Sequence, residues 1–357
     1  MKKQKNITTQ ILTILILIGV ALIVNTTIYP PRKKMTDGDS GYRVIMGTFA
    51  RIFVVADDNR ICHESINAAF ARLDQIEKTM SYHNPDSELS RLNSSAFEGP
   101  VKPSQELFEL ILKSVEFSRQ TDGAFDITVG PLVDLFHHEQ KSLEKPTQDE
   151  IAQAKKKTGF NKIVIDTDAK TIQFALKGMK LDLGGIAKGY AIDSAIQAIK
   201  SSGALGAMVD IGGDIRCFGK PPKNSESWII GLQDPTNAEP DNISRPQSQS
   251  CILTLAINDK AVTTSGDYRR FALVQGEKVS HIINPQIGSG AKELSSVTII
   301  ADSALIADAM ATAATVLGVD KALTLIESLP QIEAILIQPT EPLEIIKTSG
   351  ADAYIRQ

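Results

Sequence analysis

The chain has 357 residues, with 38 Lys or Arg and 42 Asp or Glu, which gives a formal net charge of −4. Because the charge is balanced and no basic run follows the N-terminal segment, nucleic acid is not an expected partner. The 3 cysteines share no CxxC spacing, so they indicate neither a zinc site nor a disulfide framework.

Residues 1–34 differ from the rest of the chain. An uncharged, largely aliphatic stretch (6–31) lies between basic residues on both sides, and it is long enough to span a bilayer. Neither a small-x-small cleavage site nor a cysteine follows it, which argues against a cleaved signal peptide and against lipoprotein processing. We therefore predict a transmembrane signal anchor over 1–34 and a linker over 35–42. The basic flanks give a weak positive-inside signal, and we place the globular part on the periplasmic side of the cytoplasmic membrane.

The remaining residues, 43–357, suffice for one large domain or two closely packed subdomains. Periodicity and turn residues predict strands over 43–56 (with a bulge or turn at Gly47), 162–174 (a hairpin), 206–216, 227–232, 251–258, 296–300, 334–337 and 344–347. They predict helices over 64–80, 104–120, 147–158, 186–201 and 303–317, and loops over 81–93 and 121–136. Since strands and helices do not alternate regularly, we expect an α+β fold of mixed, largely antiparallel sheets with packed helices.

The stretch KLDLGGIAKGYAID predicts a short strand (179–183), a double-glycine turn and a helix that starts at Ile186. The unpaired N–H groups and the positive dipole end of a new helix favour a bound phosphate. Lys188 lies in the first helical turn, where a cation is unfavourable for the helix itself, and this suggests an anionic partner. An ordinary turn with a surface lysine is the alternative.

The helix expected over 303–317 is small and apolar, so we expect it to be buried. Asp308 and Thr312 are four residues apart and share one face of it. Their oxygens suit a hard divalent ion such as Mg²⁺, which keeps few protein ligands and shares its shell with substrate phosphates. We therefore hypothesise a diphosphate clamped by Mg²⁺, with a backbone carbonyl near Gly185 as a further ligand and Lys188 neutralising phosphate charge. In the alternative, Asp308 only hydrogen-bonds a neighbouring loop.

His281, in the segment SHIINP, is one of 5 histidines. Near a diphosphate, its imidazole could accept a proton from an attacking hydroxyl. A structural hydrogen bond to a carbonyl is the alternative. The segment TTSGDYRRF (263–271) could hold the polar edge of a ligand, or it could be a solvated hairpin turn.

Eight segments of the chain, in order, resemble the ApbE family of flavin transferases (FAD:protein FMN transferases). They are MGTFARIFV (46–54), MSYHNPDSELSRLN (80–93), TDGAFDITVGPLVDLF (121–136), LDLGGIAKGYAID (181–193), VDIGGDI (209–215), TSGDYRRF (264–271), SHIINPQIG (280–288) and ADAMATA (307–313). The resemblance covers essentially residues 43–350 and implies the family's T-fold.

The resemblance also implies a reaction and its residues. FAD would be cleaved with Mg²⁺, FMN would be joined through a phosphoester to a Thr or Ser of a target protein, and AMP would be released. It implies FAD contacts, a metal site and a base at the following positions: Met46, Ala124, Phe125, Asp126, Asp182, Lys188 and Ile283 for FAD, the Gly185 carbonyl, Asp308 and Thr312 for the metal, and His281 as the base. Two alternatives are an FAD pyrophosphatase with water as acceptor and a flavin-binding protein without turnover.

The chain departs from the family pattern in a few places. His83 stands where the family usually has an aromatic residue, with Tyr82 one position earlier, and either ring could contact the flavin. Ala311 replaces an Asp that some members place before the metal-binding Thr, and Asn284 replaces a common Asp. Many members are lipoproteins, whereas this chain has the predicted anchor. We therefore expect its target to be a flavoprotein subunit of a membrane electron-transport complex.

Overall fold

The computed structural model describes residues 35–142, 145–222, 225–236, 250–266, 271–274, 277–280 and 282–356. The predicted signal anchor (1–34) and the predicted base His281 lie outside these residues. Within the described ranges, no helix is both long and apolar enough to cross a membrane.

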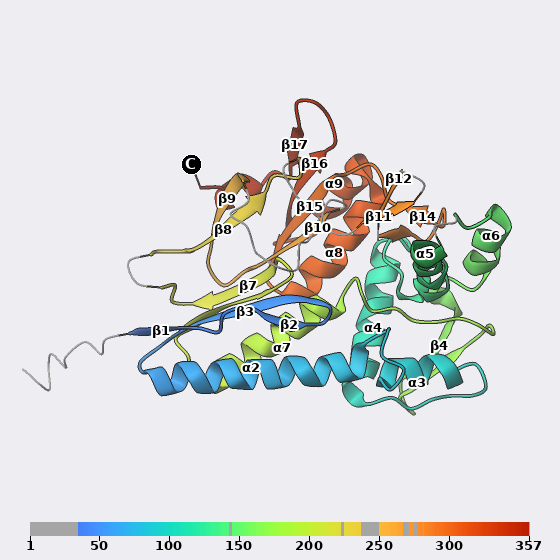
Figure 1. Ribbon diagram of the computed structural model, residues 1–357, viewed down its shortest axis with the longest axis horizontal. Helices are drawn as coiled ribbons and strands as arrows, with labels where there is room; N and C mark the ends of the chain where they lie inside the picture. Colours follow the sequence, from blue (N-terminus) through green and yellow to red (C-terminus); the bar gives the residue numbers. More distant parts are fainter. Residues whose placement is uncertain are drawn as a thin grey trace, which may run out of the picture.

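A 9-stranded sheet forms the centre of the molecule (Figure 1). Its strand order is β1-β3-β6-β7-β10-β15-β16-β17, and β2 pairs with β3 beside β1. The strands are β1 (Thr36–Asp39), β2 (Arg43–Ile45), β3 (Thr48–Ala56), β6 (Gly206–Ile211), β7 (Asp214–Gly219), β10 (Ala261–Gly266), β15 (Ser296–Ala301), β16 (Glu333–Gln338) and β17 (Glu344–Lys347). Each of these pairings is antiparallel, so the expected α+β fold with antiparallel sheet is confirmed.

Four two-stranded sheets accompany the central one, and their pairings are antiparallel as well. They pair β4 (Ile163–Asp166) with β5 (Thr171–Phe174), β8 (Trp228–Gln233) with β9 (Cys251–Ile257), β11 (Phe271–Val274) with β12 (Glu277–Ser280), and β13 (Ile283–Asn284) with β14 (Ser289–Gly290). The β4–β5 pair is the hairpin that the sequence predicts.

Helices pack on one face of the central sheet, and the β8–β9 hairpin covers the other (Figure 1). The helices against the sheet are α2 (Asn59–Met80), α7 (Ala187–Ser201), α8 (Ala304–Leu317) and α9 (Val319–Glu327). Beyond them lie α3 (Glu88–Ser95), α4 (Gln105–Gln120), η1 (Ile127–Val129), α5 (Gly130–Ser142), α6 (Gln148–Lys156) and η2 (Phe160–Lys162), while η3 (Ala351–Tyr354) packs beside β9. Alternation along the strands supplies both cores: Val54 faces the helices and Val55 faces the hairpin.

Four sequence predictions of local structure are wrong. The expected linker 35–42 contains β1, which pairs with β3, so part of it belongs to the sheet. The expected loop 81–93 contains the start of α3, whose first turn is capped by Ser87 (Ser90 N to Ser87 Oγ 3.0 Å). The expected loop 121–136 contains η1 and much of α5. Pro131 is compatible with the helix because it lies in the first turn of α5, where no intrahelical N–H bond is lost.

The expected strand 179–183 is also wrong, although the chain there is held firmly. The side chain of Asn93 donates to Leu181 O (2.9 Å) and accepts from Leu181 N (2.7 Å). Asp182 N donates to Ile127 O at 2.7 Å. A side-chain amide and one carbonyl of η1 thus satisfy backbone groups that a neighbouring strand would otherwise bind.

Candidate active site

The helix α7 begins, as predicted, immediately after the double glycine. Gly184 N donates to Asp182 Oδ1 at 2.7 Å, which closes a tight turn. The cap residue, Ile186, supplies no side-chain hydrogen bond to the helix. Ala187 N finds a local partner in Leu183 O (2.8 Å), whereas Gly189 N depends on a partner from another helix.

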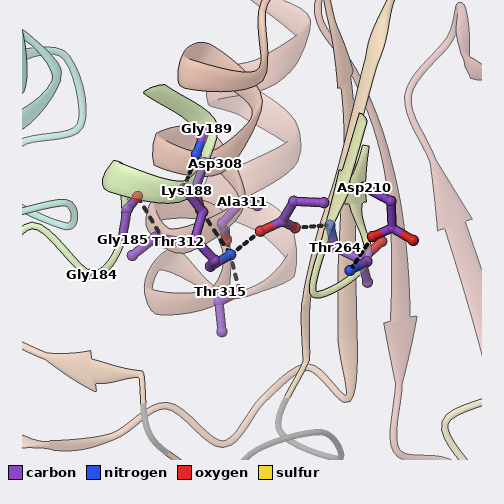
Figure 2. Close-up of polar contacts among 12 residues, drawn as sticks. Gly184, Gly185, Lys188, Gly189, Asp210, Thr264, Asp308, Ala311, Thr312 and Thr315 are labelled. Carbon is purple, nitrogen blue, oxygen red and sulfur yellow. Dashed lines mark hydrogen bonds and ion pairs between the residues drawn. The ribbon is translucent and has the colours of Figure 1, made fainter. Parts of the chain in front are cut away.

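Gly185 lies where two other elements press against the turn. A Cβ at this position would stand 3.0 Å from Thr312 Oγ1 and 3.4 Å from Phe125 Cε2. The absence of a side chain lets α8 approach until Thr312 Oγ1 is 3.5 Å from Gly185 O. The carbonyl and the hydroxyl of the predicted metal site are thus brought together (Figure 2).

Asp308 is 2% exposed and lies one turn before Thr312 on α8. Its Oδ2 accepts a hydrogen bond from Gly189 N in the first turn of α7 (2.9 Å), and its Oδ1 is 3.7 Å from Lys188 Nζ. A buried carboxylate needs such compensation. Figure 2 shows that Gly185, Lys188, Asp308 and Thr312 meet where the start of α7 packs against α8.

Asp214 completes this arrangement and was not among the predicted site residues. It is 1% exposed, begins β7 after the Gly212–Gly213 turn, and forms an ion pair with Lys188. Thr264 N donates to its other oxygen at 3.2 Å. Two carboxylates around one ammonium group give the site a net negative charge, which favours a cation. The available signal was the second double glycine, followed at once by an acid, in VDIGGD.

The donors at this site are a carboxylate, a hydroxyl and a backbone carbonyl, which are hard oxygen ligands of the kind that Mg²⁺ prefers. Within the described residues, no group of three or more His, Cys, Asp and Glu side chains could hold a metal ion. That finding does not bear on this set, because two of its three donors are a threonine and a main-chain oxygen.

Comparison with known proteins identifies the family of the chain. The ApbE family model matches residues 46–336. The chain belongs to the ApbE family.

Curated relatives and solved structures of the family cover most of the chain. FAD:protein FMN transferases from Treponema pallidum and Escherichia coli K12 are 30% and 32% identical, over 83% and 78% of this chain and the same shares of their own. The ApbE protein of Thermotoga maritima superposes with a TM-score of 0.79 at 29% identity, over 91% of this chain and 100% of its own. The flavin transferase ApbE of Vibrio cholerae gives 0.74 at 26%, over 90% and 99%.

Phe125 and its neighbours, which the ApbE resemblance implies as FAD contacts, pack against the double-glycine turn. Phe125 is buried against Gly185 and stacks edge-on with Phe117, with 6.3 Å between ring centroids. Ala124 is buried beside it. Asp126 uses its carboxylate within the fold: Oδ1 accepts from Thr128 N (2.8 Å) and Oδ2 from Phe160 N (2.9 Å). Burial raises the pKa of this carboxyl above its ordinary value.

Met46 occupies the turn between β2 and β3, in agreement with the bulge or turn predicted at Gly47. It adopts a left-handed conformation with φ of 49°, and its N–H donates to Glu77 Oε1 of α2 at 3.0 Å. This turn lies beside the Gly212 turn, because Gly212 N donates to Phe49 O at 2.8 Å. Met46 is therefore at the end of the sheet where Asp214 begins β7.

Tyr82 and His83 have different surroundings. The Tyr82 hydroxyl lies 2.7 Å from Asp134 Oδ1 and 3.0 Å from Gly130 O, and burial raises its pKa. Lys180 Nζ binds the other oxygen of Asp134 at 2.5 Å. The His83 ring meets the Tyr82 ring edge-on, with centroids 5.5 Å apart. The hydroxyl of Tyr82 is thus bound by α5, while its ring contacts the ring of His83.

Ile283 lies in the short strand β13, and Asn284 follows it there. Asn284 Oδ1 accepts from Gln286 N at 2.9 Å, which stabilises the next turn. Gln286 Nε2 donates to Asp122 O at 3.1 Å, so this turn contacts the loop that leads to Phe125. His281, just before this segment, and residues 267–270 of the TTSGDYRRF segment lie outside the described residues.

Proposed function

We propose that this chain cleaves FAD and attaches FMN to a target protein. The curated relatives carry the name FAD:protein FMN transferase. The observation that supports the proposal most directly is the buried Asp308 beside Lys188 at the start of α7, within reach of Thr312 and the Gly185 carbonyl. Such a site offers both a cation-binding group and phosphate-binding N–H donors.

Gly185 O, the Asp308 carboxylate and Thr312 Oγ1 are the groups that would hold Mg²⁺. Bound there, the ion would neutralise the charge of the FAD diphosphate. Lys188 stands 3.7 Å from Asp308 and in contact with Asp214, so its ammonium is held in place before a substrate arrives. A pre-positioned ammonium stabilises charge that develops on phosphate oxygens in the transition state.

The proposed transfer forms one phosphoester bond and breaks one diphosphate bond. The oxygen of a target Thr or Ser attacks the FMN phosphorus, the bond to the AMP phosphate breaks, and AMP leaves with the bonding electron pair. His281 takes the proton of the attacking hydroxyl. The acceptor hydroxyl belongs to the partner, which is why the chain needs no nucleophile of its own.

The remaining predicted contacts complete the proposal for FAD. Met46, Ala124, Phe125, Asp126, Asp182 and Ile283 would surround it, together with one of the rings of Tyr82 and His83. The hydroxyl of Tyr82 is occupied by Asp134 and Gly130, so a contact from Tyr82 would be made by its ring. We also retain the membrane anchor over 1–34, the periplasmic orientation and a flavoprotein subunit of a membrane electron-transport complex as proposals.

Co-expression with a candidate flavoprotein subunit tests the function. We expect the subunit to gain the mass of FMN on one Thr or Ser, measured by mass spectrometry, and to gain nothing with an Asp308→Ala variant. Transfer that continues unchanged in His281→Ala would remove His281 as the base. Absence of any FMN adduct on every candidate would contradict the transferase.

A second measurement separates the transferase from an FAD pyrophosphatase. The purified chain is incubated with FAD and Mg²⁺ without acceptor protein, and AMP is followed by chromatography. Without acceptor protein, a transferase should release AMP slowly, because water is its only acceptor. AMP release should become faster when acceptor protein is added. Equally fast release with and without acceptor would identify a hydrolase, and no release in either condition would identify a flavin-binding protein.

A further inference from the structure

Helix α8, which carries two of the proposed metal ligands, and helix α7, which follows the third, cap each other. Asp308 of α8 accepts from Gly189 N in the first turn of α7 at 2.9 Å. In return, Asp193 of α7 accepts from Ala304 N (2.9 Å, Oδ1) and Leu305 N (3.0 Å, Oδ2), the first two residues of α8. Helix N-termini carry unpaired N–H groups and a partial positive charge, so each carboxylate stabilises the neighbouring helix.

Gly189 makes the close crossing of these helices possible. A Cβ there would lie 2.2 Å from Ala304 O and 2.8 Å from Asp308 Cβ, distances that a real side chain could not occupy. The start of α7 therefore rests directly on the start of α8. At this separation, a small slide of one helix along the other would change every distance between their side chains.

Arg216 connects the Asp193 cap to the sheet. Its Nη1 lies 2.5 Å from Asp193 Oδ1, and it comes from β7, the strand that Asp214 begins. The Asp193 and Arg216 side chains are 19% and 16% exposed, so the pair is largely shielded from water. One carboxylate thus joins α7, α8 and β7, which are the elements that supply Lys188, Asp308 and Asp214.

We infer that Asp193 is a positioning residue that holds α8 in register against α7, so that Asp308 and Thr312 meet the Gly185 carbonyl. The inference rests on the proposed function, since the groups it aligns are the proposed metal ligands. The Gly185 and Thr312 oxygens are 3.5 Å apart without any covalent link between their elements. Their alignment therefore depends on contacts such as the Asp193 cap, because misplacement by a fraction of an ångström weakens a shared ligand set.

Ser303 offers a matched control on the same helix. It is the N-cap of α8, and its Oγ accepts from Ile306 N at 3.2 Å. Removing Ser303 Oγ weakens the start of α8 but leaves its link to α7 intact. Removing the Asp193 carboxylate also takes acceptors from the start of α8, and in addition it removes the hydrogen bonds by which α7 holds that end of α8. The difference between the two variants isolates the effect of register from that of helix stability.

The test measures Mn²⁺ binding by the full chain without FAD, using electron paramagnetic resonance, together with thermal unfolding. We expect Asp193→Ala to weaken Mn²⁺ binding about tenfold, as removal of groups that orient metal ligands does. Asp193→Asn, which keeps one acceptor for α8, should weaken it less. Ser303→Ala should lower the melting temperature while changing Mn²⁺ affinity by less than about twofold, because it caps only its own helix.

The outcomes separate this inference from the function on which it rests. If wild type binds Mn²⁺ and Asp193→Ala binds it equally well, or if Ser303→Ala loses as much affinity, the positioning role is wrong and the metal site stands. If wild type binds no Mn²⁺, both the metal site and the positioning role are wrong. Asp193→Asn provides the comparison should Asp193→Ala fail to fold.

Discussion

The two faces of the central sheet are closed in different ways (Figure 1). On the hairpin face, Trp228, Ile230, Leu255 and Ile257 pack on sheet residues such as Val262, and that core is made of apolar side chains. On the helix face, at α7 and α8, buried Asp214 and Asp308 lie beside Lys188 among alanines and glycines. Both faces gain stability from buried apolar area, and at α7 and α8 the helix face also carries charge away from water.

This difference indicates where stability and function are separated. Burial of apolar area is the main stabilising contribution in a folded chain. Buried ion pairs contribute little net stability, since desolvation of the charges offsets their attraction. We therefore infer that the three charged groups beside the double-glycine turn serve binding or chemistry, and we expect the two faces to respond differently to substitution.

Trp228→Ala is expected to have the largest effect, and that effect should be on stability. Trp228 is 3% exposed in the core between the hairpin and the sheet, and removal of a buried aromatic side chain costs about 3–5 kcal/mol. Urea unfolding would measure the loss. FMN transfer per folded molecule should stay at the wild-type rate, because Trp228 lies on the face opposite the proposed site.

Ile229→Ala is the control for that prediction. Ile229 is the next residue on β8 and is 44% exposed, so its removal should change the free energy of unfolding by less than about 0.5 kcal/mol. A Trp228 variant that keeps its stability but loses transfer would show that the two faces are not separate in their roles.

Asp308→Asn should show the converse behaviour on the helix face. Asn can still accept from Gly189 N, so the cap on α7 survives, but the charge is lost. We expect FMN transfer to fall roughly a hundredfold, which corresponds to about 2.7 kcal/mol of transition-state stabilisation. The melting temperature should change little, because the variant also relieves the desolvation of a buried carboxylate.

Asp302→Asn is the matched control for Asp308. It lies just before α8, pairs with Lys260 and has a 56% exposed side chain, so a change of charge there should leave the transfer rate unchanged. If both variants lose transfer equally, charge at the start of α8 matters in general and the specific role of Asp308 is wrong.

The helix face also shows how much of the fold and of the site could be predicted from the sequence. Local patterns sufficed for α8: they gave Asp302 or Ser303 as its cap, Gly318 as its end and Asp308 four residues before Thr312, and the structure has Ser303 as the cap. They also suggested an anion site at the start of α7. The partnerships across the fold were missed, since nothing near Asp214 or Asp193 in the chain reveals that they face Lys188 and the N-terminus of α8.

The mistaken loop after Met80 and the mistaken strand over 179–183 have a similar physical cause. The segment after Met80 is polar and short, and α3 forms there because Leu89 and Leu92 are buried against other helices. The segment 179–183 has strand-like residues, but the side chain of Asn93 takes the place of a neighbouring strand. In both cases tertiary contacts decide the local structure, and local propensity cannot report them.

The smallest expected effect is a change in stability with pH, and it concerns Asp126. This residue follows Phe125, and its carboxylate accepts from Thr128 N and Phe160 N. Burial raises the pKa of this carboxyl above its ordinary value of 3.8 in the folded state. The folded chain therefore keeps the proton to higher pH than the unfolded chain does.

The stability that this group contributes is full below its ordinary pKa and is lost as the pH rises through the raised folded pKa. The free energy of unfolding of wild type, relative to Asp126→Asn, should thus decrease as the pH rises above the ordinary pKa, and it should level off once the pH has passed the raised folded pKa. Urea titrations of both proteins at several pH values would measure this difference. A difference that grows with pH would show instead that the donors from Thr128 and Phe160 outweigh burial and hold Asp126 as a carboxylate.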